Sequence, residues 1–373
     1  MVASVPSMIG QFNMENIKIL QELGYEVEVA CNFYDRSVWD DNRVQEFIKE
    51  LKQKRIKTYQ IDFSRNSKNM LQHIKTYHQL ELLLEKRKYN FIHCHTPIAS
   101  TITRLVAHKN DIKVIYTAHG FHFFKGAPIQ NWILYYPVER FLSRYTDVLL
   151  TINKEDYNRA KTFRAKKIEY IPGVGIDIGK FKNCKVDVEK KKEELGIPKY
   201  AKVLLSVGEL NKNKNHIVVI KALSKLKRKN IYYLICGKGK EDIYLKKIAK
   251  QLGIGEQVIL TGFIQNIEEI YHIADIFIFP SKREGLGLAA VEAMASGLPL
   301  VTSNVHGIND YSINGISGYK VNPTDIDGFY RTIKYLLEKE KLCDDIKENN
   351  KKNAENFSGF IVQNKMKKIY KDM

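Results

Sequence analysis

Short apolar runs alternate with longer stretches of helical periodicity along almost the whole chain, and this alternation constrains the fold more than any other feature. In the first half it predicts a helix over residues 67–88. The predicted strands there are residues 25–31, 89–95, 112–120, 147–153 and 167–173. Strands that alternate with helices in this way are typical of βαβ units, whose strands form a parallel sheet. The first half is therefore predicted to be an α/β domain.

The same pattern starts again at Lys202. Its predicted strands are residues 202–208, 231–239, 257–263, 275–281 and 298–303, and two of its predicted helices are residues 215–228 and 241–252. We therefore predict an α/β protein with two doubly wound, Rossmann-like domains that face each other across a cleft. The domains are predicted to span residues 1–172 and 173–356, with a glycine-rich hinge at their junction and a last helix, 357–373, that packs back on the first domain.

The size and composition fit this architecture. A chain of 373 residues is long for a single core and suits two domains of ~150–200 residues each. With 44% hydrophobic and 27% charged residues, the composition is typical of a soluble globular protein. No apolar stretch approaches the ~18–20 residues of a membrane span, and no signal peptide is evident. The 5 cysteines are scattered without a CxxC pair, which favours reduced thiols in the cytoplasm over disulfides or structural zinc.

The formal net charge of +18 indicates an anionic partner, which could be nucleic acid, an anionic membrane or a phosphorylated substrate. No helix-turn-helix, zinc finger or aromatic RNA-binding motif is present, so we expect no nucleic-acid partner. Basic and apolar residues interleave in the region 49–88, where Leu71, Ile74, Tyr77 and Leu80–Leu84 lie. This region is predicted to meet anionic lipid headgroups. The alternative for it is a core-packing helix with a solvated face.

Ligands of open α/β sheets bind beyond the carboxyl ends of the strands. The residues that directly follow the predicted strands are therefore the candidate site, and they include Thr96, His119, Gly208, Gly237 and Gly262.

The stretch that follows the predicted strand 275–281 carries two acids. It reads SKREGLGLAAVEAMASG, at residues 281–297. The glycines before LAAVEAMAS predict a turn followed by a helix, with Glu284 at the helix tip and Glu292 about two turns inside. At ~1.5 Å per residue the two acids are then roughly 12 Å apart. The free amides of residues 285–288 between them would attract an anion. A nucleotide sugar, with hydroxyls at both ends and phosphates in the middle, matches this layout. The alternative is an acid favoured by the helix dipole beside an ordinary surface glutamate.

This Glu-x7-Glu segment strongly resembles the donor-site signature of the retaining family 4 glycosyltransferases, which have the GT-B fold. Four further stretches resemble the branch of that family that builds capsular and exopolysaccharide repeat units. They are IHCHTPIAS (92–100), YTAHGFHFFKGAP (116–128), SVGELNKNKNH (206–216) and LTGFIQNIEEIYHIADIFIFPSKREGLG (260–287). The resemblance implies a hexosyltransferase that moves a sugar from a nucleotide diphosphate, most often UDP, to an acceptor hydroxyl with retention of configuration.

For the donor, the resemblance implies that Glu284 holds sugar hydroxyls, Glu292 holds the ribose hydroxyls and Lys214 neutralises the diphosphate. It also implies no metal and no cofactor, so that fixed cations and amides meet the leaving-group charge. Taken alone, Lys214 has the alternative of a solvated loop lysine. Phe263 and Ile264 would offer backbone groups to the base. The other expected donor-binding residues are Gly208, Glu209, Gly237, Gly285, Leu286, Gly287 and Leu288.

For the acceptor, the resemblance places His119 near the reacting sugar, so His119, Lys214 and Glu284 are the expected catalytic residues. A histidine at this position is as often a satisfied polar group. The expected acceptor-binding residues are Gly10, Asn13, His95, His119 and His122, with Gly10 in a flexible loop at residues 6–13. His93 and His95 lack a third ligand nearby, so no metal site is expected. The implied acceptor is a polyprenyl-diphosphate-linked saccharide or another glycan, which places the protein on the inner face of the cell membrane.

The chain departs from the family pattern at Glu209, where many members carry arginine, and at Asp310, where they often carry glutamate. Its opening MVASVP leaves a very short first strand, as if a few residues of the usual opening were missing. Two other functions stay open. A UDP-sugar 2-epimerase would share the architecture but need no acceptor, and a non-catalytic partner subunit would have lost nucleotide binding. No oligomeric state is predicted.

Overall fold

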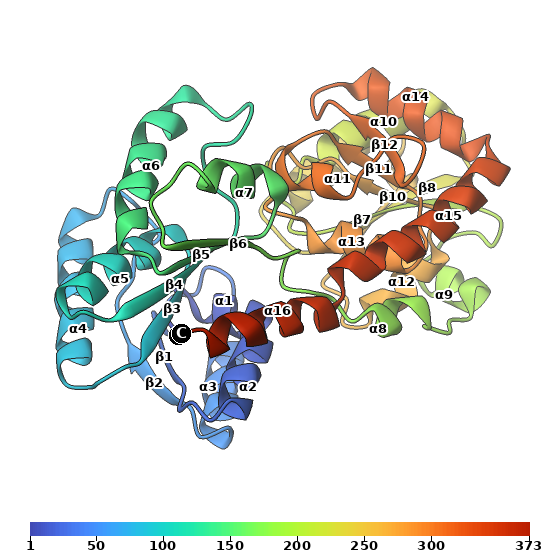
Figure 1. Cartoon of the computed structure of the whole chain (residues 1–373). Helices are drawn as coiled ribbons and strands as arrows, with labels where there is room; N and C mark the ends of the chain where they lie inside the picture. The colour runs from blue at the N-terminus through green and yellow to red at the C-terminus, as the bar shows by residue number, and fades with distance from the viewer. The chain divides into compact units, whose positions relative to one another are not determined.

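The computed structural model describes residues 1–373, which form two compact units, each with its own parallel sheet (Figure 1). Unit 1 consists of Met1–Val174 and Phe360–Met373, and unit 2 consists of Gly175–Gly359. The predicted pair of doubly wound α/β domains is confirmed. None of the helices combines the length and the apolar character that crossing a bilayer requires.

The sheet of unit 1 reverses its strand order close to the start of the chain. Its strands are β1 (Glu28–Cys31), β2 (Lys57–Gln60), β3 (Phe91–His95), β4 (Lys113–Ala118), β5 (Val148–Thr151) and β6 (Lys167–Tyr170). Val2 bridges Ala30 of β1 on one side and Cys94 of β3 on the other, so the opening residues join the pair β1–β2 to the row β3–β4–β5–β6. The short predicted opening strand is thus a single bridging residue. The residues after Val2 and after β3 lie where the order reverses, which is where ligands of such sheets bind.

Helices cover this sheet. They are α1 (Pro6–Phe12), α2 (Met14–Glu22), α3 (Asp41–Gln53), α4 (Met70–Glu85), α5 (Pro97–Lys109), α6 (Ile129–Leu142), α7 (Lys154–Ala160) and α16 (Gly359–Lys371). A short 3-10 turn, η1 (Ser143–Tyr145), follows α6. The core includes Leu80 and Leu84 of α4, Val106 of α5 and Tyr116 of β4. The last turn of α16 packs in this unit, because the ring of Tyr370 stacks on that of Phe91 at 6.0 Å between centroids.

The sheet of unit 2 has the order β9–β8–β7–β10–β11–β12, with all strands parallel. Its strands are β7 (Lys202–Val207), β8 (Ile231–Cys236), β9 (Val258–Gly262), β10 (Ile276–Phe279), β11 (Leu300–Ser303) and β12 (Gly318–Val321). This is the order 3-2-1-4-5-6 of a dinucleotide-binding sheet, and it reverses between β7 and β10. The loops after these two strands are therefore the first place to look for a ligand.

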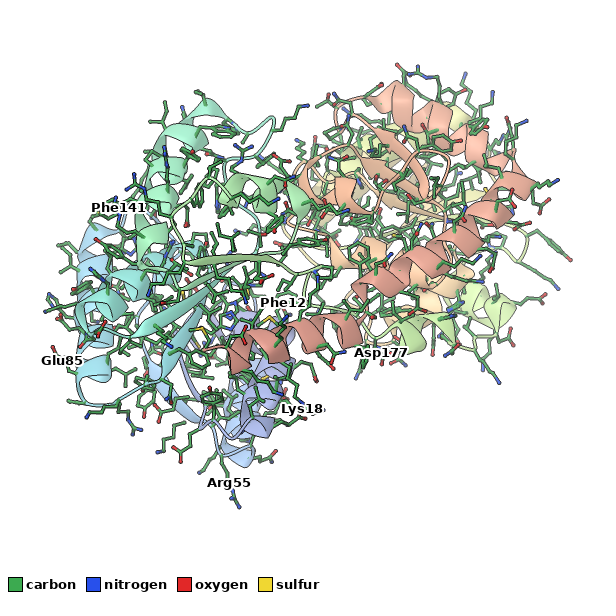
Figure 2. All side chains as sticks on the ribbon, in the orientation of Figure 1. Phe12, Lys18, Arg55, Glu85, Phe141 and Asp177 are labelled. Atoms are coloured by element: carbon green, nitrogen blue, oxygen red, sulfur yellow. The ribbon has the colours of Figure 1, made fainter.

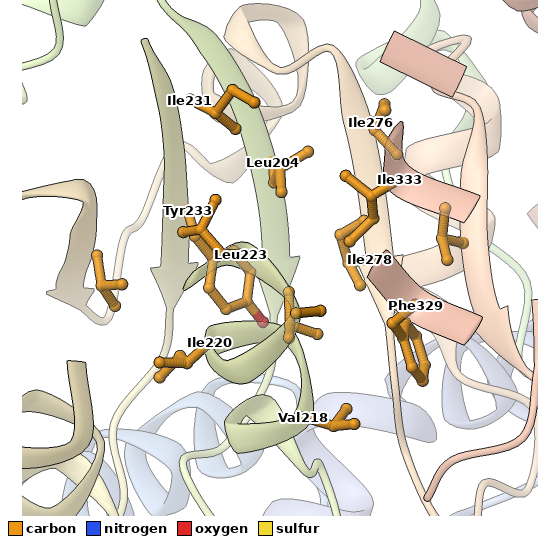
Figure 3. Close-up of a cluster of buried hydrophobic side chains, with 14 of the residues drawn as sticks. Leu204, Val218, Ile220, Leu223, Ile231, Tyr233, Ile276, Ile278, Phe329 and Ile333 are labelled. Carbon is orange, nitrogen blue, oxygen red and sulfur yellow. The ribbon is translucent and has the colours of Figure 1, made fainter. Parts of the chain in front are cut away.

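The core of unit 2 lies between the sheet and two helices. Figure 3 shows Leu204, Tyr233 and Ile278 of the strands beside residues of α10 (His216–Leu226) and α14 (Ile326–Leu337). The other helices are α8 (Ile178–Lys182), α9 (Val188–Glu194), α11 (Asp242–Gln251), α12 (Ile267–Ile273), α13 (Leu288–Ala295) and α15 (Glu340–Ala354). The 3-10 turns are η2 (Gly255–Gln257), η3 (His306–Asp310) and η4 (Glu355–Phe357).

The sequence patterns missed two strands, β2 and β12, and both are edge strands. Central strands of a parallel sheet are buried on both faces and read as continuous apolar runs, whereas an edge strand does not. The residues of β2 are KTYQ, none of them buried. The predicted helix over residues 67–88 is α4, which is shorter at both ends.

Candidate active site

The loops after β7 and β10 bring two predicted catalytic residues into contact. Lys214 Nζ donates a hydrogen bond to Glu284 Oε1 at 2.6 Å, and both side chains are largely buried. The same ammonium lies 4.8 Å from the centre of the Phe279 ring, at the end of β10. Gly208 makes room for this arrangement, because a Cβ there would lie 3.1 Å from the Lys214 side chain. A cation and a carboxylate are thus held together at the point where the sheet reverses its order.

Lys214 is not a solvated loop lysine, because the residues before and after it are hydrogen-bonded to the loop that follows β10. Asn213 donates from Nδ2 to the carbonyl of Arg283 at 2.9 Å and accepts from the amide of Lys282 at 2.8 Å. Asn215 donates to the carbonyl of Pro280 at 3.0 Å. These bonds fix the position of Lys214 relative to the loop that carries Glu284.

The ends of β7, β8 and β9 come so close that glycine is required. A Cβ at Gly237 would lie 1.9 Å from the carbonyl oxygen of Gly208, and the φ of Gly237 is +154°. The amide of Gly237 donates to the carbonyl of Gly262 at 2.8 Å. The predicted glycine turn therefore keeps the ends of β7, β8 and β9 together, next to Gly208, which contacts Lys214.

Replacing Gly237 with alanine is expected to lower the free energy of unfolding by about 2–3 kcal/mol, because the new Cβ would force the backbone at Gly208 to move. Urea titration of both proteins would measure this loss. Gly255→Ala is the control, since a Cβ there meets only ordinary contacts of 3.6 Å or more. An equal and small effect of both substitutions would contradict the close approach.

Helix α13 begins at Leu288, the first residue of the predicted helical stretch, but the positions given to both acids relative to it are corrected. Gly287, in the left-handed region at φ +88°, is its N-cap, and the helix starts at Leu288. Glu284 therefore lies in the loop before the helix rather than at its tip, and Glu292 lies about one turn inside rather than two. Glu292 is not an ordinary surface glutamate. It is mostly buried, the hydroxyl of Tyr271 donates to its Oε2 at 2.8 Å, and burial raises its pKa.

The sequence analysis did not predict two tyrosines of this site. Tyr271 holds Glu292, and Tyr311 is buried with a hydroxyl that has no hydrogen-bond partner. That hydroxyl lies 3.0 Å from the position of a Cβ on Gly287, beside the loop that carries Glu284. A buried hydroxyl without a partner is costly, so Tyr311 marks a place where a polar ligand group fits. Both tyrosines stand in mixed polar and apolar stretches, where no spacing distinguishes them from core residues.

The remaining predicted donor residues surround this loop or follow neighbouring strands. Leu286 is buried, and the backbone at Gly285 touches the loop of η3, where the amide of Gly307 donates to the carbonyl of Glu284 at 3.2 Å. Phe263 follows β9 with an exposed ring, next to a half-buried Ile264. Leu288 is the first residue of α13. Glu209 is exposed directly after Gly208, so the acid that departs from the family pattern stands in solvent.

In unit 1 the structure brings together three of the predicted acceptor residues. His95 Nδ1 lies 3.1 Å from His119 Nε2, and both rings line a small cavity of about 20 Å³ together with Asn13. Burial lowers the pKa of His119 to about 4 and that of His95 well below its usual range, so both rings are neutral at pH 7. His95 Nε2 is buried without a partner, which leaves it available to a polar group in this cavity.

The neighbouring His93 extends this cluster. Its Nδ1 lies 2.8 Å from the hydroxyl of Tyr370 in α16, and its Nε2 lies 2.8 Å from Thr117 Oγ1. The rings of His93 and His95 are 4.2 Å apart, as expected for alternate residues of one strand. Three histidines, a threonine and a tyrosine from the last helix thus form one buried polar cluster.

The other two predicted acceptor residues, Gly10 and His122, lie outside this cavity. The predicted flexible loop at residues 6–13 is mostly helix α1, and its Gly10 packs against Trp39, whose ring would lie 2.3 Å from a Cβ. The role of Gly10 is therefore close packing rather than flexibility. His122 lies outside the small cavity, with its ring 4.7 Å from that of Tyr135. A larger cavity of about 360 Å³ lies toward the amino ends of β1 and β3, and His93 is among its lining residues.

Comparisons with known proteins agree with this arrangement. The model of the family described as Glycosyltransferase Family 4 matches residues 10–178, and that of Glycosyl transferases group 1 matches residues 187–353. The glycosyltransferase EpsD of Bacillus subtilis is 32% identical over 99% of this chain and 94% of its own length. An Escherichia coli enzyme named UDP-Gal:alpha-D-GlcNAc-diphosphoundecaprenol alpha-1,3-galactosyltransferase is 27% identical over 82% of this chain and 81% of its own.

Among solved structures, that of Anabaena HepE in complex with UDP superposes over 100% of both chains with a TM-score of 0.79 at 18% identity, a likeness of fold. Two Rossmann-like units of this kind, matched by these family models, define a glycosyltransferase of the GT-B fold, a hexosyltransferase. The chain belongs to glycosyltransferase family 4. The resemblance to the branch of capsular and exopolysaccharide synthesis is thereby confirmed.

Proposed function

We propose that the chain transfers a sugar from a UDP-sugar to a hydroxyl of a polyprenyl-diphosphate-linked saccharide, with retention of configuration, in surface polysaccharide synthesis. The observation that carries this proposal is the contact of Lys214 with Glu284 at the reversal point of unit 2, in the loop before the helix that carries the buried Glu292. The E. coli relative is named for a UDP-Gal donor and a diphosphoundecaprenol-linked acceptor, and the HepE structure holds UDP. Both support the proposed pair of substrates.

The donor pocket has a distinct task for each group. In the structure, Lys214 and Glu284 neutralise each other. When the donor binds, the ammonium turns to the diphosphate and the carboxylate accepts hydrogen bonds from sugar hydroxyls. The amides at the start of α13 add to the positive potential at the phosphates. Glu292, held by Tyr271, meets the ribose hydroxyls.

The transfer itself is a front-face displacement. The bond from the anomeric carbon to the diphosphate oxygen breaks while the bond to the acceptor oxygen forms on the same face of the sugar. The acceptor proton passes to the leaving phosphate oxygen, and Lys214 stabilises the negative charge that remains on the diphosphate. In this proposal the charge is met by protein groups, so no metal and no cofactor take part.

The histidine cluster of unit 1 serves the acceptor. Its neutral rings donate and accept hydrogen bonds without adding charge, which suits a sugar hydroxyl. His119 contacts the reacting hydroxyl or its sugar, and Asn13 and His95 line the same cavity. Because the acceptor is anchored by a lipid, the enzyme works at the inner face of the cell membrane.

Nucleotide binding is the first test. Thermal unfolding with UDP, GDP or NAD in excess EDTA is expected to show a shift with UDP alone. Ligand at 100 times its dissociation constant should stabilise the fold by about 2.7 kcal/mol. Glu292→Gln should reduce the shift, whereas Glu256→Gln, an exposed acid of the same unit, should leave it unchanged.

The outcomes separate the functions. A shift that needs a divalent metal would contradict the metal-free donor site. The absence of a shift with any nucleotide would favour a non-catalytic partner subunit. If UDP binds and the UDP-sugar is consumed without an acceptor, the protein is an epimerase instead.

A further inference from the structure

Helix α6 presents an apolar face to the surroundings of unit 1. Ile129, Ile133 and Leu134 are 71%, 66% and 62% exposed, and Val138 and Phe141 are also exposed. Successive members of this set are one, three or four positions apart, and together they cover one half of the helix circumference. We call these five residues the α6 face. Figure 1 shows α6 on the outside of unit 1, and Figure 2 labels Phe141 at the outer side of the helix.

The opposite side of α6 is fixed to the domain, so the α6 face cannot turn inward. Glu139 Oε2 forms an ion pair with Arg104 Nη2 of α5 at 2.9 Å, and both side chains are buried. The guanidinium of Arg104 lies 4.4 Å from the ring of Tyr116. Leu142 is buried on the same side as Glu139. A buried ion pair of this kind is strongly destabilising to break, so the helix has one orientation.

Within the segment that carries the α6 face, the exposed charges have one sign. Between Phe121 and Thr146, Lys125, Arg140 and Arg144 are exposed bases, and the single acid is the buried Glu139. The guanidinium of Arg144 lies 4.2 Å from the centre of the Phe141 ring, so a cation sits directly on the apolar side chains. Trp132, Tyr135 and Tyr136 are half-buried and pack against the core of unit 1. Exposed apolar residues bordered by bases are typical of helices that lie in a membrane interface.

We propose that the α6 face lies in the surface of a bilayer with anionic headgroups. This inference rests on the proposed function, because a lipid-linked acceptor is reached at a membrane. A protein partner would leave the three bases to be matched by its own acids, whereas anionic lipid supplies negative charge along the whole rim.

The surface differs from the one that the sequence predicted in the region 49–88. Leu80 and Leu84 of α4 belong to the core, so that part of the prediction is wrong. Leu71 and Ile74 are exposed, but the basic residue beside them, Lys75, is paired with Asp62 at 2.7 Å. Two acids, Glu81 and Glu85, follow further along α4, and their negative charge would be repelled by anionic lipid. The α6 face is therefore the better lipid-binding surface.

Sedimentation with vesicles tests the proposal on the full chain. The wild type is expected to bind vesicles of phosphatidylglycerol and phosphatidylethanolamine, and to bind phosphatidylcholine vesicles more weakly. The triple variant Ile133→Ser, Leu134→Ser, Phe141→Ser should bind the anionic vesicles roughly 100-fold more weakly, since three large apolar groups no longer enter the interface. Arg140→Gln with Arg144→Gln should weaken binding to anionic vesicles and leave binding to phosphatidylcholine unchanged.

The matched control is Ile243→Ser with Tyr244→Ser, which removes two exposed apolar residues of α11 in unit 2 and should not alter vesicle binding. The UDP-induced thermal shift, measured on each variant, reports folding independently of lipid. Loss of vesicle binding in the triple variant with an intact UDP shift supports the proposal. Transfer to a water-soluble short-chain acceptor should then be unchanged in the triple variant.

Three results would overturn the proposal. They are a wild type that does not bind vesicles, a triple variant that binds as the wild type does, and a loss of binding in Leu71→Ser with Ile74→Ser while the triple variant still binds. A dimer in solution that the triple variant converts to a monomer, with no change in vesicle binding, would make a second copy of the chain the occupant. Vesicle binding is measured without sugar transfer, so a failure of the proposed function would be seen separately in the transfer assay.

Discussion

Replacing Lys214 with methionine is expected to reduce sugar transfer by roughly 1,000-fold. Removal of a single group that stabilises developing negative charge typically costs ~10²–10³ in rate, and Lys214 is the lysine that the structure places in contact with Glu284. The substitution also leaves Glu284 without its cation. Methionine keeps the length of the side chain, so the packing against Gly208 and Phe279 is preserved. Release of UDP from the UDP-sugar in the presence of acceptor measures the loss.

Lys212→Met is the matched control, because this lysine is exposed in the same loop. It should change the rate less than threefold, within the range of a surface charge. The loss in Lys214→Met should appear mainly in kcat, since in the proposed mechanism the cation acts most strongly when the diphosphate leaves. A variant with normal kcat and a raised KM would mean that Lys214 only binds the donor. Equal losses in both variants would mean that general surface charge, and not the position of Lys214, is what matters.

Acidification is expected to destabilise the protein steeply between about pH 6.5 and pH 4. Burial lowers the pKa of four histidines: His93 and His95 well below their usual range, His119 to about 4 and His216 to about 3. The unfolded chain binds these protons at about pH 6.5, whereas the folded chain does not. Stability is therefore fully present above about pH 7 and falls as the pH drops below the unfolded pKa.

The size of this effect follows from the same shifts. A histidine with a folded pKa of about 4 contributes a loss of about 2 kcal/mol between pH 7 and pH 5. Glu292 acts in the opposite sense, because its raised pKa means that it releases a proton on unfolding. Urea midpoints at pH 7.5, 6.0 and 5.0 would measure the net proton uptake. His216→Gln should reduce the slope by one proton, while His78→Gln, an exposed histidine, should not change it. A flat profile would contradict the lowered pKa values, because the folded and unfolded chains would then bind the same number of protons.

Periodicity predicts the centre of each sheet better than its rim. Strands β7 and β10 are continuous apolar runs because helices cover both of their faces, and their loops are therefore placed correctly by sequence. The edge strand β2 has no such run and was missed. Spacing along the chain also places Glu284 and Glu292 near one helix, but the helix starts only after the left-handed Gly287, so Glu284 lies before it and Glu292 about one turn inside it.

A single sequence does not show which residues far apart in the chain contact each other. Lys214 and Glu284 are 70 positions apart, and only the strand order of unit 2 brings their loops together. In unit 1, alternation along β3 predicts that His93 and His95 share a face, yet the partner of His95 comes from the end of β4. Tyr370 lies 277 positions from His93 and could be paired with it only in three dimensions.

This last contact has a consequence for how the protein is made. Unit 1 takes its first 174 residues from the start of the chain and its last 14 from the end, with the whole of unit 2 synthesised in between. The sheet of unit 1 can thus form early on the ribosome, but the hydroxyl that pairs with His93 arrives only with the fourth residue from the end. A nascent chain that has released all of unit 2 but not Tyr370 still lacks a complete histidine cluster, so this cluster is completed only after unit 2.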